Sequence, residues 1–435
     1  MAKINYVEKN KALVISVISA VALILAGVLL FSVIFSGHGT VMSNGDLMSK
    51  VRVSRKGGEP DDEFKKIYSE FSLKLLKSSA NTSENVAFSL ADAVSATALM
   101  AYSASGDTQV EIERALGTTG MKAGKNISGL QKRSAYSNKK GAGLKSANNL
   151  WLNNAALFGI KKSFLKTNGK YFGLGIYRDS FADSKIADSA STKISDATDG
   201  NTFSQMRFDQ TQYMNLVSGA SFVAKWKNQV SSKNLTDNLF AGSQSEASCP
   251  FFTSVEDGYL NGTTYSGAVK AYEGGFSFVG LVPSYTQEGS VYTISEVLEE
   301  LETSGGIANL KAGLINGKTE VILPDYSNSV NIPTTTDLSD ALKEAGAEKL
   351  FTKSADLGSL APKSQNLHLD SFSMAGDIQI TPAGSCSSTS EGKAVTKKEL
   401  SECKNSVEFN RSFLFFVVDD RSGLPIYAGI LNKLD

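Results

Sequence analysis

The sequence predicts an α+β fold, in one large domain that begins near residue 63 and continues to the C-terminus. Helical and strand signals alternate irregularly along these residues, which favours an α+β domain over a doubly wound sheet. No repeat with a period of about 20–50 residues is present, so a repeat architecture is not predicted. Hydrophobic residues make up 41% of the 435-residue chain, which is enough for a large core.

Composition and motifs exclude several classes of function. The chain carries 44 Lys and Arg against 44 Asp and Glu, and this neutrality argues against a nucleic-acid partner. The 3 Cys are scattered, so neither a disulfide framework nor a zinc site is expected, and the 2 His leave little room for histidine-based catalysis. P-loops, dinucleotide-binding turns and nucleophile elbows are absent from the sequence. We therefore expect neither an enzyme nor a cofactor or metal site.

The N-terminal part contains a charge-free apolar segment, residues 12–35. A helix needs about 20 residues to cross a bilayer, whereas a cleavable signal peptide has an apolar stretch of about 7–15 residues. Three lysines precede the segment, so the positive-inside rule places residues 1–11 in the cytoplasm and the domain outside it. We expect a transmembrane signal-anchor over residues 12–35, with a cleaved signal peptide as the alternative.

Residues 36–62 are rich in Gly, Ser and charged side chains, which is typical of a solvated stalk or linker. Within this segment, Lys50, Arg52, Arg55 and Lys56 could instead touch anionic lipid headgroups. The stalk is the favoured interpretation, and the domain itself is expected over residues 63–435.

Four helices are predicted from apolar spacing and capping signals. Residues 64–75 place apolar side chains on one stripe of an amphipathic helix, and residues 91–103 are dominated by Ala, Val, Leu and Met. A third helix should begin at Thr108, in a capping-box pattern with the Glu three residues later, and stop before Gly117. A short helix is expected over Leu338–Ala345.

Strands are predicted from runs of apolar residues bounded by turn residues. The candidates are Asn148–Leu152, Thr319–Leu323, Ser412–Val418 and Leu424–Leu431. The last two are almost wholly apolar and flank a polar turn, so we expect a hairpin that is buried on both faces.

Eight motifs follow one another at characteristic separations. They are Asn85–Asp92 (NVAFSLAD), Ala147–Leu152 (ANNLWL), Phe222–Trp226 (FVAKW), Val321–Pro324 (VILP), Thr336–Gly346, Leu350–Leu357, Phe409–Phe416 (FNRSFLFF) and Gly429–Asn432 (GILN). Their ordered combination resembles the serpin family over about Glu63 to Asp435. That resemblance implies a mostly antiparallel five-stranded central sheet, further sheets and about eight helices, behind the predicted transmembrane helix.

The resemblance also implies a mechanism of protease inhibition. An exposed reactive loop offers a bait peptide bond to a serine or cysteine protease. After acylation, the loop inserts as an extra strand into the central sheet and carries the trapped enzyme to the far end of the inhibitor. The native sheet therefore stores free energy that becomes available only when the loop is cleaved.

The segment expected to act as the reactive loop covers about residues 384–408. It is long, low in apolar content and rich in Ser, Lys and Glu, and loops of this length in compact domains are usually functional or disordered. The resemblance places Gly384 at the loop hinge. The next six residues are all small, which suits entry into a closing sheet: Ser385, Cys386, Ser387, Ser388, Thr389 and Ser390.

The bait bond is placed by counting along the loop. Counting forward from Gly384, as the family's spacing implies, gives Lys398–Glu399, whereas counting back from the C-terminal hairpin gives a position near Ser401. The bait window is therefore 397–402, with Lys397 as the competitor of Lys398. A trypsin-like pocket carries a carboxylate that pairs with Lys or Arg, so a trypsin-like protease is the expected partner.

Several residues depart from the family's pattern. The departures are Leu90, Asp92, Ser218 and Met374 in the hydrogen-bonded cluster that gates sheet opening, and Pro382 and Glu391 in the loop. The hydrogen-bonded cluster, which we call the gate, must therefore be rebuilt or absent. In an inserted strand, the alternation of side chains would point Glu391 towards the interior. The short connection from Gly117 to Ala147 also leads us to expect a reduced fourth helix.

Two functions remain open within the family, and a third outside it. The first is a membrane-tethered, monomeric serpin-type inhibitor of an extracytoplasmic trypsin-like protease, favoured by the small-residue hinge and the basic bait. The second is a non-inhibitory serpin-fold binding or surface protein, favoured by Pro382, Glu391 and the altered gate. An unrelated exported α+β protein is the third.

Overall fold

The computed structural model describes residues 39–156, 159–200, 206–233, 235–326, 334–362, 367–386 and 390–434. The expected cytoplasmic tail over residues 1–11 and the expected transmembrane helix over residues 12–35 lie outside these ranges. Among the described residues, no helix combines the length and the apolar composition needed to cross a membrane.

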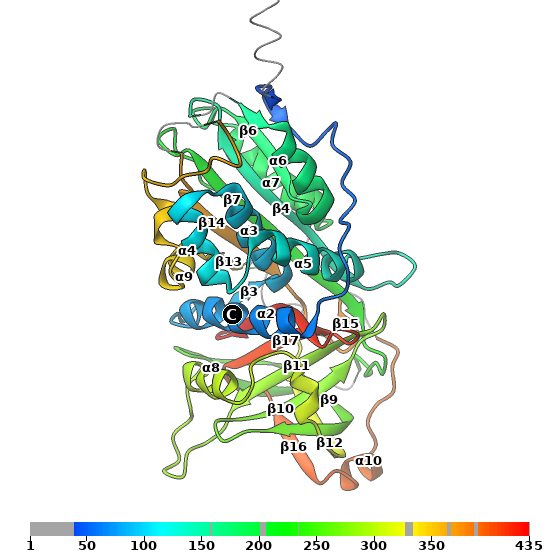
Figure 1. Ribbon diagram of the computed structural model, residues 1–435. Coiled ribbons are helices and arrows are strands. Elements are labelled where there is room, and N and C mark those ends of the chain that lie inside the picture. Colours follow the sequence, from blue (N-terminus) through cyan, green and yellow to red (C-terminus); the bar gives the residue numbers. More distant parts are fainter. Residues whose placement is uncertain are drawn as a thin grey trace, which may run out of the picture.

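The first described segment, residues 39–61, lies along the domain, and we call it the strap. Its strand β1 (Thr40–Val41) pairs with β5 (Ile160–Lys161). Its strand β2 (Gly45–Asp46) pairs with β6 (Gly175–Asp179) and so extends the edge of the central sheet. Figure 1 shows the strap, in dark blue, running along one side of the molecule to α2.

Buried side chains and backbone hydrogen bonds hold the strap in place. Leu47 and Met48 are both buried in the core, and the Ser54 amide donates to the Gly169 carbonyl at 2.7 Å. For residues 39–61, these contacts correct the expectation of a solvated stalk over 36–62, whose first three residues lie outside the described ranges. The segment is rich in Gly and charged residues, but it also contains two apolar side chains that are buried in the domain and backbone amides that hydrogen-bond to it.

Two of the predicted helices lie in the middle of the molecule (Figure 1). Helix α2 (Asp62–Ser79) begins at Asp61, whose carboxylate accepts a hydrogen bond from the Phe64 amide at 2.7 Å. The stripe predicted over residues 64–75 faces the core. Helix α3 (Leu90–Ser103) is buried over almost its whole length, as expected for a run of Ala, Val, Leu and Met.

The next two helices differ from expectation at their starts. Helix α4 (Gly106–Leu116) begins two residues before Thr108, whose hydroxyl accepts from the Asp356 amide at 3.0 Å instead of capping the helix. It ends as predicted, at Gly117, which has the left-handed φ of +82°. Helix α5 (Gly120–Ser134) follows at once, so the fourth helix of the fold is present and the expectation of a reduced one is wrong.

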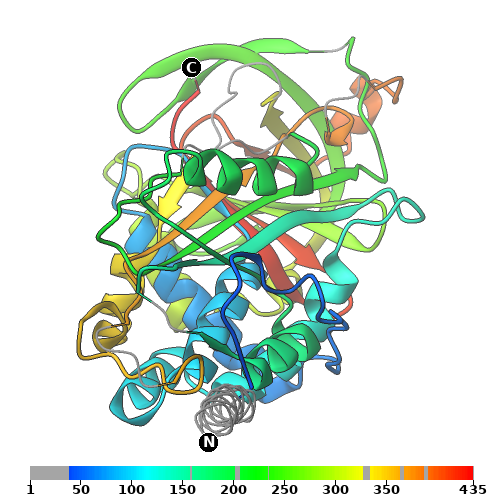
Figure 2. The same cartoon turned by 90° about the horizontal axis from the view of Figure 1, so that it is seen from above.

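The remaining helices bring the number to nine in the part of the chain that the structure describes, against about eight expected. They are α6 (Lys162–Thr167), which continues into a π-helical turn (Asn168–Phe172), α7 (Ile186–Ala197), α8 (Ile294–Thr303), α9 (Ser339–Glu344) and α10 (Lys397–Ser401). Figure 2 shows α7, in green, on one face of the central sheet and the blue and cyan helices on the other.

The central sheet has seven strands rather than five. Their order is β13 (Thr334–Asp337), β14 (Ser371–Asp377), β7 (Met214–Lys225), β4 (Gly143–Asn153), β6 and β2, with β15 (Gly384–Ser385) also paired to β7. The two additional strands are the two-residue β2 and β15, from the strap and the loop hinge. The sheet is mixed: β14 runs parallel to β7 and β4 runs parallel to β6, while the other four pairings are antiparallel, as expected for a mostly antiparallel sheet.

A second sheet of nine strands forms the rest of the core. Its order is β16 (Asn405–Glu408), β12 (Ile315–Pro324), β9 (Glu246–Asn261), β10 (Tyr265–Ala271), β11 (Phe276–Pro283), β17 (Phe413–Asp419), β18 (Leu424–Leu431) and β3 (Val86–Phe88), with β8 (Thr236–Ala241) on β9. Every residue of β17 and β18 is buried, as the apolar hairpin predicted.

The molecule is elongated, and its two ends differ. Figure 1 places β6 and α6 at one end, and β5 joins β1 to the start of α6 there. Helix α10 and strand β16 lie at the opposite end. We call these the strap end and the loop end.

Candidate functional site

The candidate hinge already lies on the central sheet. Gly384 and Ser385 form β15, which pairs antiparallel with Lys225 and Ala224 of β7. A tight turn joins β14 to β15, in which the Thr381 amide donates to the Gly384 carbonyl at 2.9 Å. Gly384 has a φ of +145°, and a Cβ there would lie 2.2 Å from the Ala224 carbonyl oxygen. Only glycine therefore fits this hinge position.

An aromatic platform supports the hinge from beneath. The Trp226 indole donates to the Thr381 carbonyl at 2.7 Å and stacks on Tyr272, with ring centroids 4.0 Å apart. The Tyr272 and Ser385 hydroxyls are 2.6 Å apart. Burial raises the pKa of Tyr272 far above its ordinary value, so the phenol is neutral and hydrogen-bonds the hinge serine.

A buried ion pair lies beside this platform. The Lys270 ammonium is 2.5 Å from the Glu256 carboxylate and 5.4 Å from the Trp226 ring centroid. It also donates to the Asn228 carbonyl at 3.2 Å. These groups border a cavity of about 610 Å³ that loop residues 391–395 close from the other side. The charges beside the platform are thus neutralised, and a cavity lies between them and the loop.

The register of β15 shows how much of the loop the sheet could accept. Gly384 stands opposite Lys225 and Ser385 opposite Ala224, so each further loop residue would face the preceding residue of β7. Loop residues 384–395 would then match the whole of β7, and residues 397 and 398 would fall just beyond its end. At present β14 occupies most of this edge of β7, because its parallel ladder runs from the pair Ser371–Asn215 to the pair Asp377–Ser221.

The gate of the sheet is rebuilt from different residues. The Ser218 hydroxyl donates to the Asn148 side-chain oxygen at 3.1 Å, and the Asn148 amide donates to the Asp92 carbonyl at 2.9 Å. The Gln131 amide donates to the Asp92 carboxylate at 3.0 Å. These four residues come from β7, β4, α3 and α5, and their hydrogen bonds do not extend to β14.

Across that boundary stands an apolar side chain. Met374 of β14 pairs with Ser218 and is fully buried. A thioether is at most a weak hydrogen-bond acceptor, so the side chain contributes packing where the family has a hydrogen-bonding His. The sequence departures at Asp92, Ser218 and Met374 thus belong to a network whose side-chain hydrogen bonds hold β7 to β4. Strand β14 is held to β7 by its backbone ladder and by the packing of Met374.

The loop beyond the hinge lies against the segment that follows Trp226. Ser390 is buried, its amide donates to the Ser232 hydroxyl at 2.8 Å, and its own hydroxyl donates to the Gln229 side chain at 3.2 Å. Glu391 is exposed beside it. Three of the expected hinge residues, Ser387, Ser388 and Thr389, lie outside the described residues, and Cys386 is half-buried.

The bait window forms a short helix at the loop end. Helix α10 carries Lys397, Lys398 and Glu399, and all three are exposed. A capping box begins it: the Thr396 hydroxyl accepts from the Glu399 amide at 3.2 Å, and the Glu399 carboxylate accepts from the Thr396 amide at 2.7 Å. These hydrogen bonds lower the pKa of Glu399. The signal for this helix, a Thr followed three residues later by Glu, was present in the sequence and was missed.

The far end of the loop is tied to the second sheet. Lys318 and Glu402 form an ion pair at 2.5 Å, and β16 then pairs parallel with β12. The candidate bait is therefore held at both sides, by β15 on the central sheet and by β16 on the second. Its two lysines are accessible, but the bond between Lys398 and Glu399 is helical, so α10 must unwind before a protease can bind it extended.

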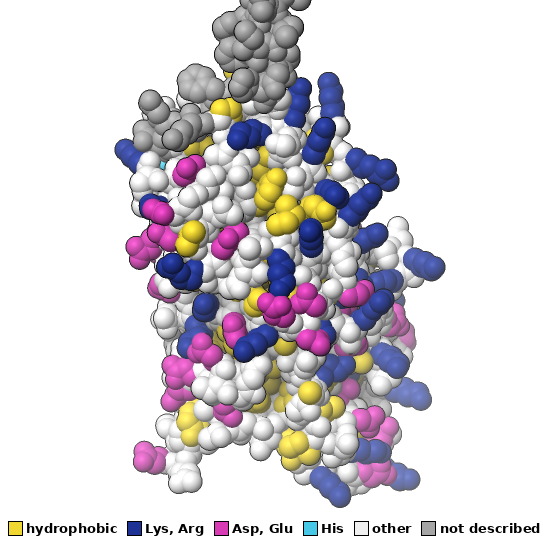
Figure 3. Space-filling model, in the orientation of Figure 1, with side chains coloured by type: hydrophobic (Ala, Val, Ile, Leu, Met, Phe, Trp, Pro, Cys, Tyr) yellow, Lys and Arg dark blue, Asp and Glu magenta, His cyan; other side chains and the backbone are white. Residues whose placement is uncertain are grey.

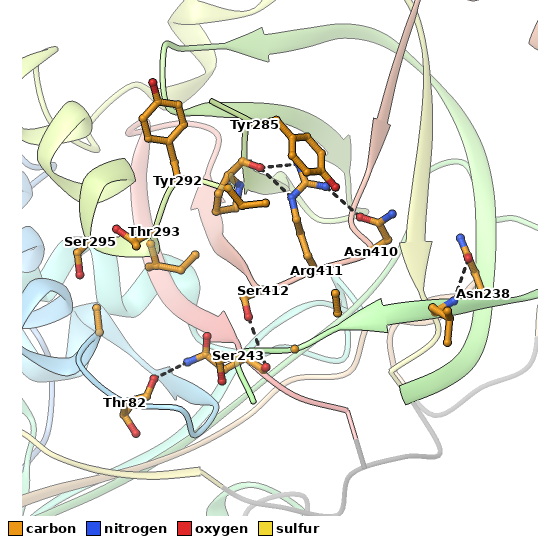
Figure 4. Close-up of a pocket in the computed structure, with 18 residues that line it drawn as sticks. Thr82, Asn238, Ser243, Tyr285, Tyr292, Thr293, Ser295, Asn410, Arg411 and Ser412 are labelled. Atoms are coloured by element: carbon orange, nitrogen blue, oxygen red, sulfur yellow. Dashed lines mark hydrogen bonds between the residues drawn. The ribbon is translucent and has the colours of Figure 1, made fainter. Parts of the chain in front are cut away.

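A second cavity, of about 560 Å³, lies away from the loop, between α8, β8 and the start of β17. Figure 4 shows Tyr285 beside Arg411, whose guanidinium carbon is 4.7 Å from the ring centroid. Arg411 donates to the Pro283 carbonyl at 2.9 Å, and desolvation lowers its pKa. Leu239, Tyr285 and Val291 line the cavity and are all exposed, which is unusual for such large apolar side chains.

Comparison with known proteins agrees with this geometry. A sequence model of the family described as "Serpin (serine protease inhibitor)" matches residues 66–434. Neuroserpin of Gallus gallus is 24% identical over 370 residues, covering 80% of this chain and 86% of that protein. Alaserpin of Manduca sexta is 23% identical over 360 residues, covering 80% of this chain and 88% of that protein.

Solved structures show the same fold. The native state of the thermophilic serpin tengpin matches with a TM-score of 0.80 at 21% identity, covering 90% of this chain and 100% of that one. Human thyroxine-binding globulin, complexed with thyroxine, matches with a TM-score of 0.72 at 18% identity, covering 85% of this chain and 98% of that one. At these identities the structural likeness speaks for the fold alone.

Proposed function

The chain belongs to the serpin family, and we propose that it is a membrane-tethered inhibitor of an extracytoplasmic trypsin-like serine or cysteine protease. In this proposal the chain is not itself an enzyme. The protease attacks the loop at the loop end, is acylated, and is trapped when the freed loop inserts between β7 and β14.

The start of an inserted strand at β15 is the observation that carries the proposal. Gly384 and Ser385 already pair with β7, so the hinge needs no new contact to begin insertion. The twelve residues 384–395 equal the length of β7 (Met214–Lys225). An inserted strand would form ladder hydrogen bonds on both sides in place of the single ladder between β7 and β14, and each added bond is worth about 0.5–1.5 kcal/mol net. The difference between the ladders formed and the ladder broken supplies the driving force for trapping.

The position of the bait supports a preference for basic residues. Lys397 and Lys398 come after the twelve residues that the sheet could accept, with only Thr396 between, so cleavage after either lysine releases the whole strand. Both side chains are exposed at the loop end. A pocket with a buried carboxylate would bind either ammonium group. We propose Lys398–Glu399 as the bond, with Lys397 as the competitor.

The membrane tether is proposed from residues 12–35, which carry no charge and follow three lysines. This arrangement keeps residues 1–11 in the cytoplasm and exports the domain. Protease added to intact cells should then digest the domain while it stays in the membrane fraction. Protection of the domain would contradict the orientation, and its release as a free chain would contradict the anchor.

Trapping is tested by mixing the purified full chain with trypsin and separating the products on a denaturing gel. The expected result is a covalent complex that survives denaturation, with cleavage after Lys398 or Lys397. A matched control is Ser385→Arg, which places a long charged side chain against Tyr272 and β7 while leaving the bait intact. The control should be nicked at the same bond without trapping trypsin. A nicked wild-type chain alone would contradict inhibition.

The second candidate is a non-inhibitory binding protein, and the 560 Å³ cavity favours it. Thyroxine-binding globulin in complex with thyroxine shows that this fold can carry a small ligand. Here the exposed Leu239, Tyr285 and Val291 surround Arg411, a combination that suits an aromatic anion. Binding of anilinonaphthalene sulfonate that is lost in Tyr285→Ala would support this function, and unchanged binding would contradict it.

A further inference from the structure

We propose that the strap end docks onto an anionic lipid surface through a basic face made by the strap, α6 and the π-helical turn. This inference rests on the proposed tether, because residues 12–35 would supply the bilayer. It goes further by assigning a lipid-binding surface and an orientation to the folded domain.

The basic face contains six exposed cations on three adjoining segments. They are Lys50, Arg52 and Lys56 on the strap, Lys162 and Lys166 on α6, and Lys170 on the π-helical turn. None of the six forms an ion pair with any residue that the structure describes. Within residues 39–58 and 160–173 the only acidic residue is Asp46. Six exposed cations with one carboxylate among them create a positive potential on this face, which attracts an external polyanion.

Chain geometry places the bilayer at this end. Strand β1 begins at Thr40 and is fixed to β5, so residues 36–39 are the whole connection to the expected anchor. Four extended residues span at most about 14 Å. Charges act over about 8–10 Å at physiological ionic strength, so the basic face would lie within reach of headgroup phosphates. Under a solvated stalk over residues 36–62, this proximity would not arise.

The shape of the face also fits a lipid surface. A groove of about 520 Å³ between the strap and α6 opens among Lys50, Lys162 and Lys166. Met42, 57% exposed, borders the groove, and Val53, 50% exposed, lies further along the strap. Apolar side chains flanked by lysines match the boundary between headgroups and acyl chains. Figure 3 shows basic side chains gathered on the upper part of the molecule, towards the strap end.

A sulfated polysaccharide is the other polyanion that six lysines and arginines could bind. The bilayer is favoured for two reasons on this surface. The polypeptide leaves the domain at β1, on the same end, and exposed Met42 would gain burial from lipid but not from a polysaccharide. In the docked orientation, α10 and the bait point away from the membrane, where a soluble protease can reach them.

The test is lysine footprinting of the full chain in nanodiscs. The chain is inserted into discs of neutral phosphatidylcholine, or of the same lipid with about 30% phosphatidylserine, and exposed briefly to a water-soluble acylating reagent. Mass spectrometry then reports modification at each lysine. Phosphatidylserine should reduce acylation of Lys50, Lys162 and Lys166 about fivefold or more, and 1 M salt should remove this protection. Acylation of Lys398, at the loop end, serves as the internal reference and should not change.

Charge-reversal variants give the matched comparison. Lys162→Glu with Lys166→Glu should abolish the protection of Lys50, whereas Lys393→Glu with Lys404→Glu, an equal charge change on the loop and beside β16, should leave it intact. Equal acylation in both kinds of disc would overturn the docking surface while the tether stands. Protection by soluble dextran sulfate but not by phosphatidylserine would overturn it in favour of a polysaccharide. A chain that carbonate washes out of the discs would overturn the tether and the docking together.

Discussion

Replacing Glu391 by threonine should favour insertion of the loop. Glu391 is now exposed, but the register of β15 would bring it opposite Ser218, the eighth position of β7 counted back from Lys225. Residues directly opposite in an antiparallel pair point to the same face, and Ser218 points to the buried network with Asn148 and Asp92. The carboxylate would therefore enter the interior beside groups that offer no positive charge.

The expected magnitude follows from this burial. Transfer of an unpaired ionised side chain into a protein interior costs several kcal/mol, taken as about 4 kcal/mol. If half of that cost is present at the barrier to insertion, the substitution lowers the barrier by about 2 kcal/mol and accelerates insertion about 30-fold. Insertion competes with hydrolysis of the acyl-enzyme, so a larger fraction of trypsin should end in the covalent complex.

The assay compares Glu391→Thr with Glu391→Asp, which keeps the charge. The measured quantities are the number of inhibitor molecules consumed per trypsin trapped, and the melting temperatures of intact and nicked protein. The Thr variant should consume fewer molecules and gain more thermal stability on nicking, while the Asp variant should behave as the wild type. Identical values for the two variants would refute the inserted register, and equal melting temperatures before and after nicking would refute insertion itself.

Three further predictions concern the bait, the gate and the sheet. Thr396→Ala removes the cap of α10 at a cost of about 1 kcal/mol to the helix, so trypsin should cleave the loop faster in a proteolysis time course. Asn148→Ala removes the side-chain hydrogen bonds that join Asn148 to Ser218 and Asp92, each worth about 0.5–1.5 kcal/mol net, so inhibitory activity should decay faster on storage at 37 °C with an unchanged rate of loop cleavage. Burial raises the pKa of Asp377 to about 6 from 3.8, so its ionised form costs the native state about 3 kcal/mol at pH 7.5. Native stability should rise as pH falls from about 6 to about 4. In urea unfolding, Asp377→Asn should stabilise the protein at pH 7.5 but much less at pH 4.5, whereas the same change at the exposed Asp237 serves as the control. A gain in stability that does not depend on pH would contradict the argument.

Local sequence signals were sufficient where burial or backbone geometry allows few alternatives. The hairpin of β17 and β18 was predictable because an unbroken apolar run on both sides of a polar turn can only be buried. Gly117 was predictable as a helix end because the left-handed φ there disfavours any side chain. The hinge at Gly384 came from the family resemblance, and its φ of +145° against the Ala224 carbonyl shows the physical reason for it.

Features that depend on contacts between distant segments could not be read from the sequence. The strap looks like a linker because Leu47 and Met48 are short signals within charged residues, and their partners lie more than a hundred residues away. The gate joins Gln131 to Asp92 and Asn148 to Ser218. These residues are far apart along the chain, so no local sequence pattern predicts the network. Helix α5 was missed because its Gly and Ser residues conceal the buried Ile127 and Leu130.

The placement of β1 opposite α10 limits the clearance for a captured protease. A trapped enzyme would ride the inserting loop along β7 towards the strap end, where the four-residue connection leaves about 14 Å beneath the bilayer. A protease domain of about 250 residues is about 45 Å across. The domain would have to back away, and the strap offers the slack: β1 and β2 have two residues each, and residues 36–61 released in full reach about 85 Å. Capture at the loop end would thus detach the strap from the domain at the other end, and the complex would lie further from the membrane than the free inhibitor.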